Sequence, residues 1–308
     1  MRAVTVSEFG RPPVVRDDVR EPVAGPGQVL VRVRASSVNW FDADIAHGTF
    51  TQIAPHRLPI TLGRDFAGIV VAVGEGVRTV ESGDEVFGLV PLGEPVHAGA
   101  WAELIVTGEH TLTRKPPALD TATAGVAALA ATTAVMAVDA LDLMPGDSVL
   151  VVGATGGVGG IAVQLARAAR ATVLAPGLPE DEEYLRGLGV SEVLPRGDDV
   201  IAAVRERRPG GVDALLDAVT AYEITPFAEA VRDGGRIASP TDAAGYGPGR
   251  TNVTHGPCTE ILGRVARHLV DGTITIPLQE SHDLADAAEA LRALTTRHTR
   301  GKIAVRVA

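Results

Sequence analysis

The most informative segment of the chain reads Val149-Leu150-Val151-Val152-Gly153-Ala154-Thr155-Gly156-Gly157-Val158-Gly159-Gly160, followed by Ile161-Ala162-Val163-Gln164-Leu165-Ala166. An apolar, strand-like run turns through glycines into a helical pattern. The first N–H groups of such a helix, with the positive end of its dipole, point at the turn and suit a pyrophosphate group. Glycine is needed there because a side chain would hold the phosphates away. We therefore predict phosphate contacts from the turn, the alternative being a glycine-rich turn without a ligand; the residues concerned are Ala154, Thr155, Gly156, Gly157, Val158 and Gly159.

The residues after Asp147 alternate between strand-like and helix-like patterns. Such alternation predicts a parallel sheet covered by helices, which is an α/β architecture. The predicted strands are Ser148 to Val152, Thr172 to Ala175, Glu192 to Leu194, Val212 to Asp217, Arg236 to Ser239 and a last one from Lys302 to Val307. The predicted helices are Gly157 to Ala169, Glu180 to Leu188, Asp199 to Arg207, Pro226 to Val231, Cys258 to Val270 and Leu284 to Thr295. The segment from Pro240 to Pro257 shows no clear strand.

The first 118 residues have a different character, being rich in Gly, Pro and Val. Short alternating runs, such as those of residues 28–34 and 67–73, predict an all-β unit. An Ala-rich stretch from Thr121 to Leu143 then predicts a helix. A chain of 308 residues is long enough for two domains, so we place a boundary between residues 118 and 119.

Composition excludes several classes of partner and site. The 38 acidic and 28 basic side chains give a net charge of -10, which disfavours binding to nucleic acid or to anionic membranes. Cys258 is the only cysteine, so neither an intrachain disulfide nor a thiolate-rich zinc site is expected. With no signal peptide and no 18-residue uncharged apolar segment recognised, we expect a cytoplasmic protein without a membrane span.

A series of ordered motifs runs nearly from one end of the chain to the other. These motifs are Gly25-Pro26-Gly27-Gln28-Val29-Leu30-Val31, Ser37-Val38-Asn39-Trp40-Phe41-Asp42, Gly63-Arg64-Asp65-Phe66-Ala67-Gly68, Val73-Gly74-Glu75-Gly76-Val77, Gly83-Asp84-Glu85-Val86-Phe87-Gly88, Ala131-Thr132-Thr133-Ala134, Gly234-Gly235-Arg236-Ile237 and Arg300-Gly301-Lys302-Ile303. With the glycine turn, they make the chain resemble the medium-chain dehydrogenase/reductase superfamily, and within it the zinc-independent quinone oxidoreductase branch.

This resemblance implies two domains with the active site in the cleft between them. The first is a GroES-like β-barrel catalytic domain of residues 1–118, completed by residues 259–308, and the second is a Rossmann dinucleotide-binding domain of residues 119–258. Zinc members of the superfamily carry a cysteine where this chain reads Trp40 to Asp42, and a His-Glu pair where it reads Arg64-Asp65. Without those ligands we expect no metal, and direct hydride transfer to an electron-poor acceptor such as a quinone or enone.

Asn39 and Asp42 match a pattern that lies near the nicotinamide and the substrate in quinone reductase-like members. We predict that they orient the acceptor as catalytic residues. The alternative is that Asn39 only satisfies backbone groups of the loop, while Asp42 caps a helix starting at Ala43.

Other candidates are weaker. Trp40, Phe41 and Phe50 are predicted to wall an apolar acceptor pocket, although aromatic residues are more often plain core. Thr133 matches a position that contacts the nicotinamide carboxamide in relatives, or else bonds its own helix backbone. The eight histidines show no metal-ligand spacing.

The cofactor is expected to be NADPH, with NADH possible. NAD-specific Rossmann proteins place an acid at the end of the second strand, where this chain has Ala175-Pro176-Gly177. Gly177 is therefore expected to border the cofactor, and Arg196 or Arg186 to meet the 2′-phosphate. Against this, Asp181 and Pro195 fall where NADPH-using relatives often present a lysine and a tyrosine.

Three functions remain open at this point. The first is an NADPH-dependent reductase of a small electron-poor quinone or enone, the second an enoyl-thioester reductase of a biosynthetic pathway, and the third a non-catalytic NAD(P)H-binding redox sensor. Relatives are often dimers paired through the edge strand of the nucleotide domain, so a homodimer is possible.

Overall fold

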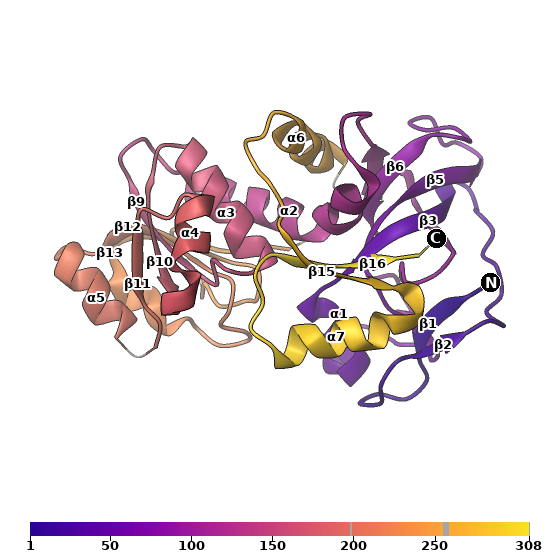
Figure 1. Ribbon diagram of the computed structural model, residues 1–308, viewed down its shortest axis with the longest axis horizontal. Helices are drawn as coiled ribbons and strands as arrows, with labels where there is room; N and C mark the ends of the chain where they lie inside the picture. The colour runs from indigo at the N-terminus through magenta and orange to yellow at the C-terminus, as the bar shows by residue number, and fades with distance from the viewer. Residues whose placement is uncertain (198, 255–258, 308) are drawn as a thin grey trace. The chain divides into compact units, whose positions relative to one another are not determined.

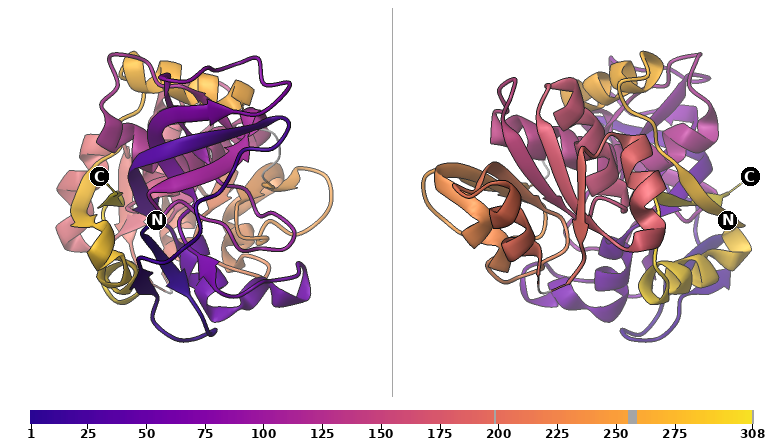
Figure 2. Two further views of the ribbon diagram at one scale, coloured as in Figure 1. Left: turned by 90° about the vertical axis from the view of Figure 1, so that its right-hand side faces the viewer. Right: turned by 60° about the vertical axis from the view of Figure 1, so that its left-hand side comes forward.

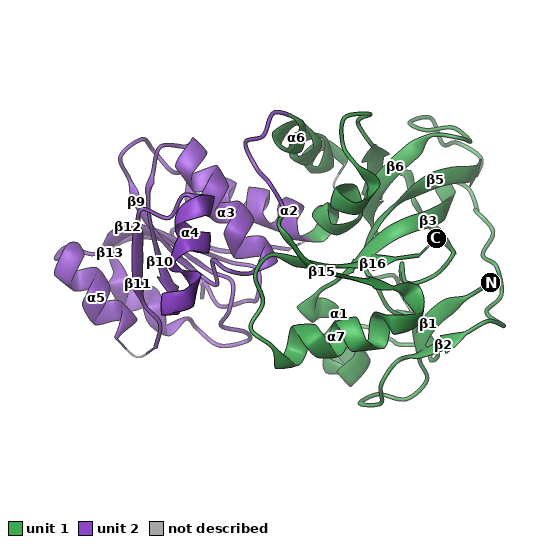
Figure 3. Cartoon of the chain, in the orientation of Figure 1, with its two compact units in different colours: residues 1–129, 257–270, 277–308 green, residues 130–256, 271–276 purple. Residues whose placement is uncertain are grey.

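A computed structural model of the chain describes residues 1–197, 199–254 and 259–307. The chain forms two compact units (Figure 3). Unit 1 comprises Met1–Leu129, Pro257–Val270 and Pro277–Ala308, and unit 2 comprises Ala130–Gly256 and Asp271–Ile276. The first division falls inside helix α2 (Thr121–Leu141) rather than at its start. Cys258, the predicted first residue of a helix, lies outside the described residues.

Unit 1 is built on the long strand β3 (Gln28–Val38). Val29, Val31 and Val33 are buried, while residues 28, 32 and 34 are exposed, so the predicted alternation is confirmed. Antiparallel pairing joins β3 to β5 (Asp65–Val73) and to β7 (Leu104–Gly108). The sheet continues through β6 (Glu85–Leu89) to β8 (Leu112–Arg114), and a separate three-stranded sheet contains β1 (Ala3–Val6), β2 (Val14–Arg16) and β4 (Ile60–Thr61).

The end of the chain completes the same sheet. Strand β16 (Lys302–Arg306) pairs antiparallel with β3 and parallel with β15 (Leu278–Asp283). Figures 1 and 2 show this yellow segment beside the indigo and purple strands of the N-terminal part. The predicted last strand is confirmed, whereas β15 was not predicted, because it is polar and partly exposed and so has no apolar alternation.

The helical segments of unit 1 are short. They are α1 (Trp40–His47), η1 (Thr49–Gln52), η2 (Glu109–Thr111), α6 (Thr259–Val270), η5 (Leu284–Asp286) and α7 (Ala287–Thr296). The predicted helix from Leu284 is confirmed, with a 3-10 first turn. Helix α7 packs on β3, β15 and β16, and its residues Ala290 and Leu294 join a core that includes Val31 and Trp101.

Unit 2 contains a six-stranded parallel sheet in the order β11-β10-β9-β12-β13-β14. Its strands are β9 (Ser148–Val152), β10 (Thr172–Gly177), β11 (Glu192–Pro195), β12 (Val212–Asp217), β13 (Val231–Ser239) and β14 (Arg250–Asn252). The five strands expected between residues 148 and 239 are confirmed, and β9 and β12 have the predicted bounds. Strand order reverses direction at β9, which places the carboxyl end of β9 at a topological switch point.

Helices pack on this sheet, with α3 (Gly157–Ala168) against β9 and β10 and beside α4 (Glu182–Leu188) (Figure 1). Helix α5 (Val200–Arg207) packs against β11 and η4 (Pro226–Ala230), and η3 (Pro179–Asp181) leads into α4. Their core includes Leu150, Leu174 and Leu215, all without exposed surface. The predicted α/β class with a doubly wound parallel sheet is therefore confirmed.

Two expectations for this part of the chain were wrong. The segment from Pro240 to Pro257 contains a strand, β14, whose three consecutive residues pair in parallel with β13. Residues 121–138 of helix α2 are 18 residues without a charged side chain. An 18-residue window of this helix has mean hydropathy 1.7, so by length and composition the helix could cross a membrane. Since 72% of that window is buried inside the protein, the same features fit a core helix.

Candidate functional site

The glycine turn after β9 has the geometry of a phosphate-binding turn. Gly153 has φ +85°, a left-handed conformation that side chains disfavour. A Cβ on Gly159 would lie 2.2 Å from the carbonyl oxygen of Gly153, so helix α3 approaches the strand as only glycine permits. Residues 154 and 159 are buried, while Thr155, Gly157 and Val158 keep part of their surface exposed. The turn thus brings the predicted residues together at the carboxyl end of β9 and the N-terminus of α3.

Gly156 is different from its neighbours. Its backbone is extended at φ -81° and ψ 177°, which any residue adopts. A Cβ there would meet only the oxygen of Gly153, at an ordinary 3.5 Å. The protein therefore has no packing need for glycine at this position, and the space that a side chain would fill lies beside the N-terminal amides of α3. These residues fit the pyrophosphate of a nicotinamide dinucleotide.

The end of the neighbouring strand carries the other predicted cofactor residues. Gly177 is buried, and a Cβ on it would come within 2.5 Å of the end of the Leu185 side chain, so a larger residue there would have to displace Leu185 of α4. Gly177 pairs with Pro195, and the exposed Arg196 follows directly, at the same edge of the sheet. The buried Asp181 carboxylate accepts a hydrogen bond from the Leu178 N–H at 3.1 Å and so holds the loop after β10.

In unit 1, Asn39 belongs to a buried ionic network. Its Nδ2 donates to Asp65 Oδ2 at 2.9 Å and to Ser37 Oγ at 3.2 Å. Its Oδ1 accepts a hydrogen bond from Nζ of Lys302, which also lies 3.6 Å from Asp65 Oδ2. Burial lowers the pKa of Lys302, and the Asp65 carboxylate opposes that effect. Asn39 therefore bonds side chains of a charged cluster, in addition to its place in the capping box of α1.

Asp42 has no exposed surface, and its carboxylate accepts hydrogen bonds from backbone N–H groups. The helix starts at Trp40, so Asn39 is the N-cap and Asp42 the third helical residue, which corrects the expectation of a cap at Asp42 for a helix starting at Ala43. The carboxylate accepts hydrogen bonds from the N–H groups of Asn39 and Gly63, both at 2.9 Å. Burial raises the pKa of Asp42 to about 6, although Arg64 and the two N–H groups oppose the shift.

The three predicted pocket aromatics separate in the structure. Phe41 and Phe50 pack together with ring centroids 4.8 Å apart and ring planes tilted by 38°, and Phe50 is only 8% exposed within the core of unit 1. Trp40, by contrast, is 60% exposed. Of the three, Trp40 alone presents most of its surface, while the Phe pair fills the core beside α1.

The remaining candidates are Thr133 and a metal site. Thr133 is buried in α2. Among the residues that the structure describes, no group of three or more His, Cys, Asp or Glu side chains is placed to hold a metal ion. His255 and Cys258 lie outside those residues.

Sequence reasoning missed Lys302 and Asp65 as members of the Asn39 cluster. Both lie in quoted motifs, but only the fold brings β16 beside β3. The sequence does hold one sign that Lys302 is special. Lys115 and Lys302 are the only lysines in a chain with 28 basic side chains, so a lysine in place of the usual arginine is itself unusual.

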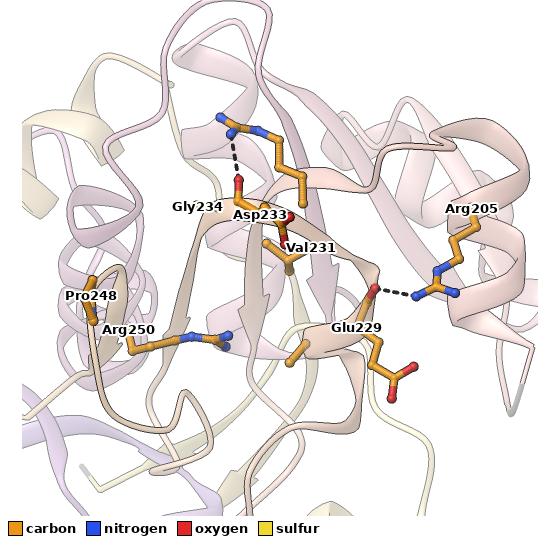
Figure 4. A pocket seen from close by; sticks show the side chains of 10 residues that line it. Arg205, Glu229, Val231, Asp233, Gly234, Pro248 and Arg250 are labelled. Atoms are coloured by element: carbon orange, nitrogen blue, oxygen red, sulfur yellow. Dashed lines mark hydrogen bonds between the residues drawn. The ribbon is translucent and has the colours of Figure 1, made fainter.

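A pocket of about 450 Å³ lies at the opposite end of the parallel sheet from the glycine turn (Figure 4). It is lined by residues at the start of β13, with Arg205, Glu229 and Arg250 around them. Arg205 donates to the Glu229 carbonyl oxygen at 3.2 Å, and the lining contains both acidic and basic side chains. The pocket has no part in the cofactor site.

Comparison with known proteins decides the family. The model of the alcohol dehydrogenase GroES-like domain matches residues 25–117, and that of zinc-binding dehydrogenases matches residues 188–305. The quinone oxidoreductase of Lama guanicoe is 34% identical over 243 residues, which cover 77% of this chain and 72% of that protein. The chain belongs to the medium-chain dehydrogenase/reductase superfamily, in its quinone oxidoreductase-like branch. It is an oxidoreductase that uses a nicotinamide cofactor, and unit 1 contains a GroES-like domain.

Solved structures agree with this membership of the medium-chain superfamily. The quinone oxidoreductase from Coxiella burnetii matches with a TM-score of 0.87 and 26% identity, covering 100% of this chain and 99% of that one. Some relatives are much larger proteins. The phthioceranic/hydroxyphthioceranic acid synthase of Mycobacterium tuberculosis is 32% identical over 307 residues, covering 92% of this chain but 14% of the synthase. This chain therefore spans about a seventh of the length of those synthases.

Proposed function

We propose that this oxidoreductase transfers hydride from NADPH to a quinone or another conjugated carbonyl, such as an enone, without a metal. The observation that carries the proposal is the open position at Gly156, where the fold leaves room beside the N-terminus of α3. The similarity to quinone oxidoreductases supports the class of acceptor.

A bound nicotinamide cofactor would supply hydride, and the acceptor would also take up one proton from solvent to give the hydroquinone or saturated carbonyl. The residues of this chain bind and orient. The turn from Ala154 to Gly159 holds the phosphates, and the Asn39 cluster keeps a polar group at a fixed orientation beside the exposed Trp40. Orientation of this kind contributes to rate by holding the reactants in a reactive geometry.

Preference for NADPH follows from charge at the ends of β10 and β11. The strand β10 ends in Ala175-Pro176-Gly177 without the acid that would bond a ribose 2′-hydroxyl. Arg196 is exposed one residue beyond β11, and its guanidinium suits a 2′-phosphate. The buried Asp181 bonds the loop backbone and so directs its carboxylate inward.

The test is a turnover assay with NADPH and NADH against quinones, enones and enoyl thioesters. We expect oxidation of NADPH to depend on a quinone or enone, with a higher kcat/KM than for NADH. Binding of NADPH without turnover of any acceptor would contradict the proposal and favour a sensor.

Enoyl-thioester reduction is the second candidate. The mycocerosic acid synthase-like polyketide synthase of Mycobacterium tuberculosis is 34% identical over 303 residues, or 91% of this chain. Both reactions add hydride to a carbon conjugated with a carbonyl, so the same arrangement serves either acceptor. Faster turnover of an enoyl thioester than of any quinone in the assay would select this candidate.

We also propose that two copies pair through the free edge of the parallel sheet. Among the described residues, β14 is the last strand of the sheet and no further strand pairs with its outer edge. Beside it, Ile224 is 70% exposed and Tyr246 is 89% exposed, on loops joined by the Thr225 N–H bond to the Ala243 oxygen. Sedimentation should show a dimer that Ile224→Glu converts to a monomer, and a monomeric wild type would contradict the pairing.

A further inference from the structure

Lys302 lies in an unusual place for a lysine. It is 5% exposed at the start of β16, and the only other lysine of the chain is Lys115. Buried lysines are rare unless they are paired, because the ammonium group loses its hydration. All other residues with a permanent positive charge, apart from Lys115, are arginines. The lysine at position 302 therefore indicates that a compact ammonium group fits here where a planar guanidinium does not.

The ammonium group of Lys302 has three acceptors around it. It donates to the Val38 carbonyl oxygen at 3.2 Å and to Asn39 Oδ1, and it forms an ion pair with Asp65 Oδ2 at 3.6 Å. The acceptors lie on β3, at the cap of α1 and on β5. An ammonium group makes three bonds in different directions, whereas the planar fork of arginine does not.

The carboxamide of Asn39 is fixed by the same contacts. Its two N–H donors are taken by Asp65 Oδ2 and Ser37 Oγ, and Lys302 occupies one lone pair of Oδ1. The opposite orientation of the amide would place its NH2 group against the ammonium and its oxygen against the carboxylate. The charges therefore determine which way the amide points, and the three side-chain bonds leave a second lone pair on Oδ1, on the side of the α1 N-terminus.

We infer that Lys302 is a positioning residue that, with Asp65, locks the Asn39 carboxamide so that only its oxygen is offered to a ligand. The ligand group at Asn39 is then a hydrogen-bond donor, a hydroxyl or N–H of the cofactor or product, and not the carbonyl oxygen of the acceptor. The role of Lys302 adds detail to the proposed function. The kinetic test below depends on that function, whereas the spectroscopic test does not.

The spectroscopic test uses the fact that Asn39 and Asn252 are the only asparagines. Protein labelled with 15N-asparagine gives two side-chain NH2 signals, and Asn39→Ala identifies one of them. We expect solvent exchange of the Asn39 NH2 group to rise about tenfold or more in Lys302→Met. The signal of Asn252, which bonds the Gly245 oxygen in unit 2, is the internal control and stays unchanged. An unchanged Asn39 signal in folded Lys302→Met overturns the inference.

The kinetic test asks whether Lys302 acts through Asn39. Lys302→Met should lower kcat about 100-fold with little change in the KM for NADPH, and Lys302→Arg should restore part of the loss. In the Asn39→Ala background, Lys302→Met should cost nothing further, because the group that it positions is gone. Additive losses overturn the inference. Lys115→Met, which removes another buried and paired lysine, is the matched control and should keep wild-type turnover.

A variant that removes both charges covers the case in which Lys302→Met does not fold. Lys302→Met combined with Asp65→Gln leaves no uncompensated charge in the core and adds no labelled asparagine. Asp65→Gln alone measures the effect of changing the Asp65 acceptor, so faster exchange at Asn39 in the double variant than in Asp65→Gln supports the inference, and equal exchange overturns it. If the wild type reduces no acceptor, the proposed function fails, and the exchange measurement still decides the role of Lys302.

Discussion

Gly159 and Gly153 approach each other so closely that a methyl group on Gly159 would lie 2.2 Å from the Gly153 carbonyl oxygen. Gly156, three residues earlier, has no such neighbour within 3.4 Å. The two glycines of this turn thus have different roles. Gly159 permits α3 to pack on β9, and Gly156 leaves space at the protein surface beside the α3 N-terminus. This difference makes the cofactor site testable by matched substitutions.

Gly156→Val should abolish NADPH binding in a folded protein. The valine has no clash with the chain, its backbone conformation is extended, and its side chain fills the space beside the α3 amides. Calorimetric titration with NADPH should show a loss of about 100-fold or more in affinity, as expected when phosphate contacts are displaced. Gly93→Val, at another glycine with open space around it, is the control and should bind normally. Unchanged affinity in Gly156→Val would remove the site assignment.

Gly159→Ala should instead lower stability. Its new methyl group meets backbone atoms, which cannot move aside as a flexible side chain does, so α3 must shift from β9. Overpacking of this kind costs about 1–3 kcal/mol of unfolding free energy. Chemical denaturation measures the loss, and a midpoint equal to that of the wild type would show that the turn relaxes freely.

Asn39→Ala should reduce turnover more than cofactor affinity. The substitution removes the fixed amide oxygen while the glycine turn, in the other unit, is unaltered. Misplaced reactants lose up to about 100-fold in rate. Steady-state kinetics and NADPH titration separate the two effects, with Asn252→Ala as the control. Wild-type turnover would reduce Asn39 to a structural residue.

Arg196→Glu should change the choice of cofactor. Loss of a charged partner of the 2′-phosphate costs about 1.5–3 kcal/mol, so the preference for NADPH over NADH should fall at least about tenfold. Arg186 is already paired with Glu182 at 2.9 Å, which makes Arg186→Glu the matched control. The ratio of kcat/KM values measures the preference, and equal ratios in both variants and the wild type would exclude Arg196.

The pKa of Asp42 predicts a specific dependence of stability on pH. It is about 6 in the folded protein, where burial raises it, against 3.8 for an ordinary aspartate. Between pH 4 and pH 6 the folded state therefore binds more protons than the unfolded state, and the free energy of unfolding falls as pH rises, by at most about 3 kcal/mol.

Asp42→Asn removes this titration. The difference in unfolding free energy between wild type and variant should decrease from pH 4 to pH 6 and be constant above that, as urea denaturation at several pH values can show. A difference that is constant throughout would mean that Asp42 is ionised even at pH 4.

Local patterns predicted most of unit 2, because strands such as β9 and β12 are apolar runs bounded by glycines and charged residues. They failed for β14 and β15, whose residues are polar and gain their strand conformation from a neighbour's hydrogen bonds. The glycine turn was predictable since its chemistry is local. The Asn39 cluster was not, because Lys302 lies 263 residues away and only the pairing of β16 with β3 brings it near.

The position of β16 has a consequence for biosynthesis. All six strands of the parallel sheet lie between residues 148 and 252, so a ribosome completes them while the sheet of unit 1 still lacks β15 and β16. Because β3 pairs with β16, which is synthesised after the whole parallel sheet, the N-terminal strands cannot complete their sheet until β16 has emerged from the ribosome. A stalled or prematurely terminated nascent chain would expose that edge of β3, and with it a hydrophobic surface for chaperones to recognise.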